Sequence, residues 1–259
     1  MAVCLLTAAI AAQAELPRIS IVIDDLGFQP GHDQAIMAMD PRLTVAIIPE
    51  APAARQLARQ AGRQRRDVLV HLPLPGLHHD DCQPLLTCIG MDWTIEAMHQ
   101  ALLTALNTVE GAIGLNNHQG SRFTSDPDSV ARLVAGIRLI SDQRDRPLLV
   151  LDSRTAAGSR LEYKARQAGL MASRRHVFLD HSSDPADIER AWQDLLHRAR
   201  SRGSAIGIAH PRINTIRFLR EALPSLQAEG IELVPVSALA VLRQEAWPAE
   251  LEARLTSVP

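Results

Sequence analysis

The sequence has few aromatic residues, few cysteines and no excess of charge of either sign. Phe, Trp and Tyr make up 3% of the 259 residues, which leaves few ring faces for stacking on a ligand. The 27 Lys and Arg residues are balanced by 29 Asp and Glu residues, so we expect no nucleic-acid partner. The 46% hydrophobic content indicates a globular protein, and the length suits a β/α barrel, which needs about 250 residues.

The first 14 residues have the features of a leader peptide. They carry no charged side chain and end in Ala12-Gln13-Ala14, a pattern typical of a signal-peptide cleavage site. The segment is shorter than a membrane-spanning helix of about 20 residues, and it lacks the usual basic start. Either translation begins further upstream or the segment is an uncleaved anchor. We expect an exported, periplasmic protein with one domain over residues 15–259 and no membrane span after leader removal.

Two of the three cysteines, Cys82 and Cys88, lie outside the leader in a loop that contains Pro and Asp. In an oxidising compartment such a pair forms a small disulfide. His78 and His79 lie close by in the sequence, so a zinc site made of two histidines and two cysteines is the alternative. Export of the protein favours the disulfide.

Strand-like and helix-like segments alternate along the chain from residue 19 onward. In Val130, Leu133, Val134 and Ile137 the apolar positions recur at the spacing of a helix that buries one face. Alternation of this kind is typical of a parallel sheet flanked by helices, and eight units favour an α/β barrel. The predicted strands are residues 19–23, 43–48, 68–72, 112–115, 148–151, 176–179, 205–209 and 231–236.

The most informative stretch runs from Ile19 to Gly27. Its apolar run predicts a strand buried on both faces, which leads directly into Asp24 and Asp25. Barrels and open α/β sheets carry their functional groups at the carboxyl ends of the strands. Because neighbouring residues on a strand point to opposite faces, we expect the two aspartates to have different roles. The alternative is a solvated Asp-Asp-x-Gly turn.

Polar groups follow six of the predicted strands, and a barrel would bring them to one rim. Asp and His side chains from separate strands are the ligands of a catalytic zinc with one position open for water. Asp25, His71 and His118 could form such a site, although cobalt, nickel or iron would also suit it. Asp24 would then act as the base and His210 as the acid on the opposite side. A buried histidine held by hydrogen bonds in the core is the alternative for His71.

Five motifs occur in order along the chain: Ile-Asp-Asp-Leu-Gly, His-Leu-Pro-Leu-Pro, Asn-Asn-His-Gln-Gly-Ser-Arg-Phe-Thr, Leu-Asp-Ser-Arg-Thr and Ile-Gly-Ile-Ala-His-Pro. Together they resemble the divergent polysaccharide deacetylase family, a bacterial branch of the NodB-type carbohydrate esterases. The resemblance covers residues 17–245. It implies a distorted (β/α)7–8 barrel of the NodB-like type and metal-dependent N-deacetylation of an amino-sugar polymer or oligosaccharide.

Carried over by position, the resemblance makes Asp24 the catalytic base, Asp25 the metal-binding aspartate, His71 the first metal-binding histidine and His210 the general acid. Typical relatives have a second metal-binding histidine four residues after the first, where this sequence has Pro75. His118 is therefore the candidate third ligand on chemical grounds alone.

Two further motifs depart from the family pattern. Asn117-His118 stand in place of an arginine-proline motif, and Ser153-Arg154 follow Asp152 where a tryptophan is usual. We expect Asn117, Asp152 and Arg154 to contact the substrate or to surround the metal ligands. Asp152 either orients a histidine or caps the segment that follows it.

Three functions fit this sequence. The first is a zinc-dependent deacetylase of amino sugars in the cell envelope or in exopolysaccharide. The second is a binding or scaffold protein of the envelope that has lost catalysis, which the missing second histidine and the scarce aromatic residues favour. The third is another metal hydrolase, such as an amidase or a phosphoesterase, which the balanced charge and the lack of a Gly-rich phosphate-binding loop disfavour.

Overall fold

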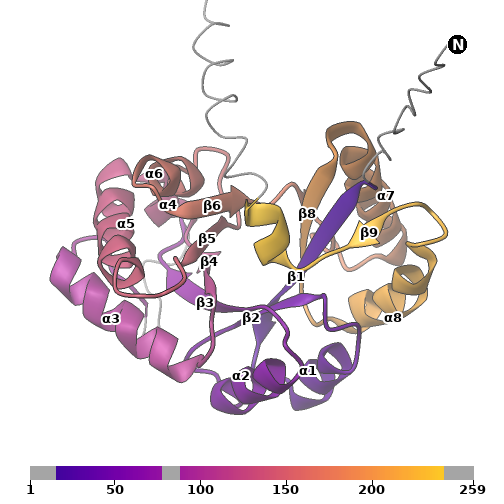
Figure 1. The fold of residues 1–259 in the computed structure, drawn as a ribbon, viewed down its shortest axis with the longest axis horizontal. Helices are drawn as coiled ribbons and strands as arrows, with labels where there is room; N and C mark the ends of the chain where they lie inside the picture. The colour runs from indigo at the N-terminus through magenta and orange to yellow at the C-terminus, as the bar shows by residue number, and fades with distance from the viewer. Residues whose placement is uncertain (1–15, 78–87, 242–259) are drawn as a thin grey trace, which may run out of the picture.

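The computed structural model describes residues 16–77 and 88–241. Eight parallel strands pair in the order β6-β5-β4-β3-β2-β1-β8-β7, and β9 pairs with the start of β1. The sheet curls, with the helices packed around its outside (Figure 1). The strands are β1 (Arg18–Leu26), β2 (Thr44–Ile47), β3 (Val68–Leu74), β4 (Gly114–Gln119), β5 (Leu149–Asp152), β6 (Met171–Arg174), β7 (Val177–Phe178), β8 (Ser204–Ala209) and β9 (Glu232–Leu233).

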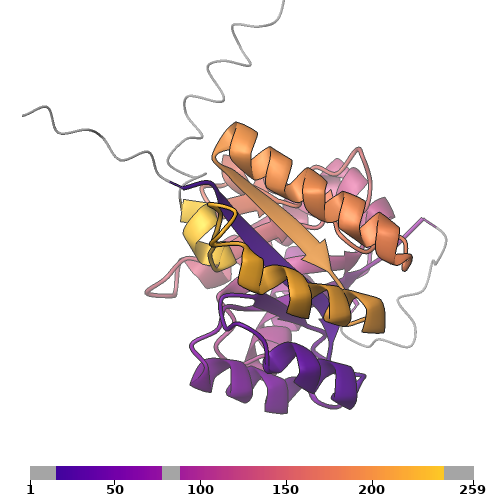
Figure 2. The same cartoon turned by 90° about the vertical axis from the view of Figure 1, so that its right-hand side faces the viewer.

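The helices follow the strands in the alternation that the sequence predicts, and the predicted α/β barrel-like fold is confirmed. Figure 2 shows α7 and α8 side by side on the outer face of β8. The helices are α1 (Pro30–Met37), α2 (Ala54–Arg63), α3 (Ile95–Thr108), α4 (Ser121–Ser125), α5 (Pro127–Ser141), α6 (Leu161–Gln167), α7 (Pro185–Arg202) and α8 (Ile213–Ala222), followed by the short 3-10 helix η1 (Leu223–Ser225).

One extended segment links the two edges of the curled sheet. β6 pairs with β5, β7 pairs with β8, and only Arg175 and His176 separate β6 from β7. The backbone N–H of Arg175 donates to the carbonyl of Asp152, and that of His176 donates to the carbonyl of Ile206, each at 2.9 Å. The chain therefore leaves one edge and joins the other, and the curl closes through these two residues.

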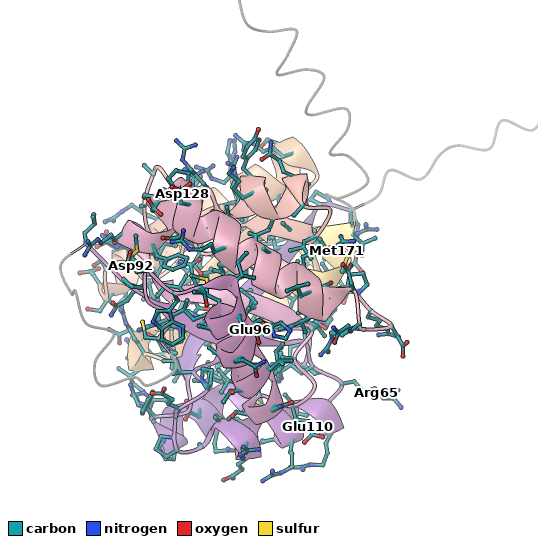
Figure 3. All side chains as sticks on the ribbon, turned by 90° about the vertical axis from the view of Figure 1, so that its left-hand side faces the viewer. Arg65, Asp92, Glu96, Glu110, Asp128 and Met171 are labelled. Atoms are coloured by element: carbon teal, nitrogen blue, oxygen red, sulfur yellow. The ribbon has the colours of Figure 1, made fainter. Side chains whose placement is uncertain are left out.

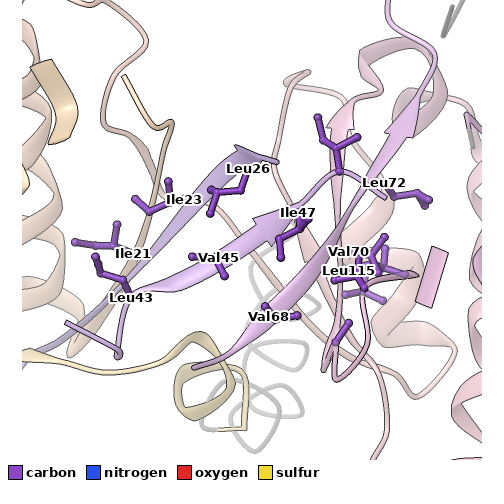
Figure 4. Close-up of a cluster of buried hydrophobic side chains, with 14 of the residues drawn as sticks. Ile21, Ile23, Leu26, Leu43, Val45, Ile47, Val68, Val70, Leu72 and Leu115 are labelled. Atoms are coloured by element: carbon purple, nitrogen blue, oxygen red, sulfur yellow. The ribbon is translucent and has the colours of Figure 1, made fainter. Parts of the chain in front are cut away.

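Two hydrophobic clusters lie on the two faces of the sheet. Ile21 and Ile23 of β1 belong to the larger cluster, between the strands and the helices (Figure 4). Val22, between them in the sequence, belongs to a smaller cluster on the other face, which Val236 and Leu239 from the end of the described chain complete. β1 is thus buried on both faces, as its sequence predicts.

Charged side chains lie on the outer surface of the helices. Figure 3 shows Glu96 of α3 and Asp128 of α5 projecting from this face, and both are exposed. The apolar sides of the same helices face the sheet through residues such as Met98 and Leu133. This division is the one expected for amphipathic helices that cover a sheet.

Several strands differ from the sequence prediction, and β1 and β3 extend to Leu26 and Leu74, beyond their predicted ends. β4 extends to Gln119, so Asn116, Asn117 and His118 lie on the strand instead of after it. Their backbones continue the ladder with β3 as far as the Leu74–Gln119 pair, although the apolar run ends at Leu115. β6 was not predicted, because its four residues, Met-Ala-Ser-Arg, form no apolar run.

The predicted strand 231–236 is shorter than expected. Only Glu232 and Leu233 form β9, which pairs with the first two residues of β1. Val234 and Val236 instead bury their side chains in the smaller cluster. The apolar run was therefore correct as a sign of burial and wrong as a sign of strand length.

Gly114 allows a close approach between β4 and β5. A Cβ added at Gly114 would lie 2.0 Å from the carbonyl oxygen of Leu149, a backbone atom that has no room to move aside. We predict that Gly114→Ala lowers the free energy of unfolding by about 1–3 kcal/mol or more.

The control is Gly62→Ala in α2, where an added Cβ meets nothing within 4 Å. This variant should raise the free energy of unfolding by about 0.5–1 kcal/mol, because Ala favours the helix over Gly. Urea unfolding measures both values. A Gly114→Ala protein as stable as the wild type would contradict the close approach.

Candidate metal centre

The two aspartates of β1 lie on a β-bulge. β1 pairs with β2 at Ile23–Val45 and again at Leu26–Ile47, so β1 has one residue more than its partner between these pairs. Asp25 has a φ of 60°, in the left-handed region that Asp adopts more readily than most residues. Bulges redirect side chains and are common beside active sites.

As a result, the two carboxylates reach the same histidine although they are neighbours on a strand. His71 Nε2 lies 3.1 Å from Asp25 Oδ1 and 3.8 Å from Asp24 Oδ2. The expectation that the two aspartates point to opposite faces is therefore wrong here, because the extra residue of the bulge breaks the alternation.

Asp25, His71 and His118 meet at the carboxyl ends of β1, β3 and β4. His118 Nδ1 lies 2.9 Å from Asp25 Oδ1 and 3.1 Å from His71 Nε2. With the Asp25–His71 contact, the three atoms form a nearly equilateral triangle. Asp25 and His118 are partly exposed whereas His71 is buried, so the triangle is open on one side.

The triangle fits a divalent cation. Three ligands at the usual zinc distances of about 2.0–2.1 Å would be about 3.3 Å apart in a tetrahedral arrangement. The observed separations of 2.9–3.1 Å are close to that value. Two imidazole nitrogens that face each other at 3.1 Å also need a proton or a cation between them, since their lone pairs repel. One carboxylate with two imidazoles is a donor set that suits zinc.

When no cation is bound, protonation of His71 compensates the carboxylates of the cluster. Burial alone would raise the pKa of Asp25, but hydrogen bonds from His118 and His71 outweigh it and hold that pKa well below its usual range. Burial disfavours a charge on His71, yet the nearby carboxylates of Asp24 and Asp25 raise its pKa to about 9. In the metal-free protein, His71 therefore carries a proton at neutral pH where a metal ion would otherwise compensate the carboxylates.

Asp24 lies beside the triangle and is almost completely buried. Burial raises its pKa above the usual value, while the positive charges of His71 and His210 oppose that rise. A carboxylate with a raised pKa is a stronger base than an exposed one, which is what proton abstraction from water requires.

His210 faces the same centre from the end of β8. Its Nε2 lies 3.6 Å from Asp25 Oδ2, and its Nδ1 lies 2.9 Å from Asp180 Oδ1. Because an ionised carboxylate only accepts, Nδ1 carries the proton in that bond and Nε2 points into the site. Burial disfavours the charged ring, but the hydrogen bond to Asp180 and the negative charge of Asp180 raise the pKa of His210.

Asp180 is a residue that the sequence analysis did not select. It is completely buried, and its second oxygen accepts from the backbone N–H of His210 and from the Thr215 hydroxyl. The signal was present, since an aspartate directly follows a predicted strand. Asn116 was also not selected, although it contacts both His71 and Asp24.

Asn117, Asp152 and Arg154 make their hydrogen bonds within the neighbouring loops. Asn117 accepts from the backbone N–H of Ser153 and donates to the carbonyl of Gln119. Asp152 accepts from the backbone N–H of Arg154 and from the Ser159 hydroxyl, and Arg154 donates to a nearby carbonyl. These contacts favour the capping role of Asp152 over the orientation of a histidine. In the described part of the chain, none of the three hydrogen-bonds to a member of the triangle.

Residues 21–240 match the sequence model of the family described as divergent polysaccharide deacetylase. The match spans most of the chain and includes every residue of the candidate centre. The chain belongs to the divergent polysaccharide deacetylase family.

Three bacterial proteins are similar to this chain over most of their length. An uncharacterised protein of Haemophilus influenzae is 38% identical over 222 residues, which are 86% of this chain and 76% of that protein. The uncharacterised protein YibQ of Escherichia coli K12 is 32% identical over 223 residues, which are 86% of this chain and 67% of that protein. The crystal structure of the uncharacterised protein ATU2773 from Agrobacterium tumefaciens C58 has a TM-score of 0.80 at 25% identity and covers 88% of this chain and 91% of its own.

In this member of the divergent polysaccharide deacetylase family, the second imidazole of the candidate centre comes from β4. Pro75, where the resemblance leads us to expect a histidine, follows the end of β3, and its carbonyl accepts the backbone N–H of Phe123. His118 brings Nδ1 to the triangle from the adjacent strand. The roles of Asp25, His71 and His118 as metal ligands stay a prediction.

Several expectations fall on residues outside the described ranges. They are the leader of residues 1–14, Cys82 of the expected disulfide, and His78 and His79 of the alternative zinc site. Cys88 is disulfide-bonded. Among the helices of residues 16–77 and 88–241, none has both the length and the apolar character needed to cross a membrane.

Zinc binding should release protons. The His71 pKa of about 9 means that the metal-free protein holds a proton which coordination through Nε2 would displace. We predict release of about one proton per zinc at pH 7, falling towards zero above pH 9, with zinc affinity rising over the same range. Isothermal titration in two buffers of different ionisation enthalpy measures this release. Zinc binding at pH 7 with no proton release would contradict the assigned charge of His71.

Proposed function

We propose that this protein is an exported, zinc-dependent hydrolase that removes acetyl groups from the amino sugars of a cell-envelope polysaccharide. One observation carries the proposal: an Asp/His/His triangle suited to a divalent cation lies beside a buried carboxylate, Asp24, and an oriented imidazole, His210. Membership in the divergent polysaccharide deacetylase family supports the choice of an amide of an amino sugar as the bond that is hydrolysed.

Asp25, His71 and His118 would hold the metal ion. When bound, such an ion polarises the amide carbonyl and acidifies the attacking water. The remaining groups are arranged for the two proton transfers that amide hydrolysis requires, one from water and one to the leaving amine.

Asp24 takes the first proton. The Asp24 carboxylate accepts this proton from the water molecule whose oxygen forms the new bond to the acyl carbon. His210 supplies the second proton from Nε2 to the amide nitrogen as the carbon–nitrogen bond breaks, so that acetate and a free amine are released. Asp180 keeps the Nδ1 proton in place, so the Nε2 proton is the one that His210 transfers.

Asp24→Asn tests the role of the base. We predict that kcat for acetate release falls by about 10²–10⁴-fold, because Asn cannot accept the proton of water. The zinc content should stay at the wild-type level, since Asp24 is not in the triangle. Acetylated chito-oligosaccharides and peptidoglycan fragments serve as substrates, and acetate is quantified enzymatically.

Asp25→Ala is the matched variant on the neighbouring residue and should lose both zinc and activity. An Asp24→Asn protein with wild-type kcat would disprove the assignment of the base. Wild-type protein that binds zinc but releases no acetate from either substrate would instead favour the scaffold function.

Asp180→Asn tests the orientation of His210. Asn has one accepting oxygen and a donating NH2 group where Asp180 has two accepting oxygens, so His210 should lose its fixed tautomer and kcat should fall by about 10²-fold. The zinc content should be unchanged. Thr215→Val removes only the hydroxyl bond to Asp180 and should reduce kcat much less. Equal losses in the two variants would point to a general packing defect around Asp180.

A further inference from the structure

Asn116 is the one completely buried amide in direct contact with the residues of the centre that the structure describes. It lies on β4 opposite His71 of β3, in register across the parallel ladder. Its Oδ1 is 2.9 Å from His71 Nδ1, and its Nδ2 is 2.8 Å from Asp24 Oδ1 and 3.2 Å from the Ser153 hydroxyl. One side chain thus joins a proposed metal ligand to the proposed base.

The direction of this amide is fixed by its surroundings. Asp24 can only accept when ionised, so the NH2 group must face it and the oxygen must face His71. The reverse orientation would set the amide oxygen against a carboxylate oxygen at 2.8 Å in a buried site. The network therefore allows one orientation of the amide, with both ends used.

That orientation determines the chemistry of both neighbours. An amide oxygen cannot donate, so His71 Nδ1 must carry a proton, and Nε2 is left to face Asp25 and His118 with its lone pair once a metal displaces its proton. At the other end, the NH2 group holds Asp24 Oδ1, which leaves Oδ2 directed towards the centre, 3.8 Å from His71 Nε2.

We propose that Asn116 is a positioning residue which orients His71 for metal binding through its oxygen and Asp24 for proton abstraction through its NH2 group. The second half of this inference rests on the proposed function, and the first half does not. If Asn116 had only a structural role in the core, its substitutions would not affect zinc binding and proton abstraction separately.

Two substitutions separate the two ends of the amide. Asn116→Leu has a similar volume and neither hydrogen bond, so zinc affinity should weaken by about 10–100-fold, the usual cost of losing a partner that orients a metal-binding histidine. Asn116→Asp keeps an acceptor for His71 Nδ1 but replaces the donor to Asp24 with a second carboxyl oxygen, so the two carboxyl groups repel each other or share a proton. Its zinc affinity should stay within about threefold of the wild type, while kcat for acetate release should fall at least about tenfold.

The readouts include two that need no substrate. Zinc affinity is measured by chelator competition, and the visible absorption spectrum of the cobalt-loaded protein reports the orientation of the imidazole ligands. Asn116→Leu should change the cobalt spectrum, and Asn116→Asp should preserve it. Thr215→Val, which removes a buried hydrogen bond of the same site on the side of His210, is the control and should change neither zinc affinity nor the spectrum.

Two results would overturn the inference. One is an Asn116→Leu protein with wild-type zinc affinity and an unchanged cobalt spectrum. The other is an Asn116→Asp protein in which zinc affinity and kcat are either both lost or both retained. This second test does not require the Asn116→Leu protein to fold. A wild-type protein without deacetylase activity would refute the proposed function. The zinc-affinity and cobalt measurements do not depend on turnover, so they would still test the contact between Asn116 and His71.

Discussion

The structure depends on the compensation of two neighbouring carboxylates at the end of a buried strand. An isolated charge in an apolar environment is so costly that it is neutralised, paired or bound to a metal. Asp25 is partnered by His71 and His118, and Asp24 by Asn116 and the charge of His71. These partners come from β3 and β4, so the same interactions that make the carboxylates tolerable also assemble the candidate metal centre.

Backbone geometry makes this compensation achievable. Regular alternation would have placed one of the two aspartates among the apolar side chains between sheet and helices, where Ile23 packs. The extra residue of the bulge and the left-handed conformation of Asp25 bring both carboxylates within reach of His71 instead. A residue in that conformation usually costs some stability, and such strain tends to be found at functional sites. The bulge therefore accounts both for the unusual backbone at Asp25 and for the convergence of the polar groups.

Sequence analysis could identify Asp25, His71 and His118 because each ends or follows an apolar run, and parallel strands bring such ends together. It could not find the bulge, because an extra residue leaves no mark on the apolar pattern. It selected Asn117 and overlooked Asn116, because the end of β4 was placed at Leu115. Period-two alternation could have corrected this choice: a strand that carries His118 into the centre also carries Asn116 there and turns Asn117 away. Asp180 directly follows a predicted strand, but its role depends on a hydrogen bond to His210, after β8, that only the folded chain brings about.

The proposed ligand His118 departs from the family pattern in sequence but lies beside Asp25 and His71 in space. The family resemblance places the second metal-binding histidine at residue 75, after β3, where this chain has a proline. β4 lies next to β3, and its residue His118 pairs in register with Pro73. An imidazole on the adjacent strand can therefore approach the aspartate of β1, and His118 Nδ1 lies 2.9 Å from Asp25 Oδ1. Because metal binding depends on which donor atoms converge and at what distances, the loss of the expected histidine does not by itself argue for the loss of the centre.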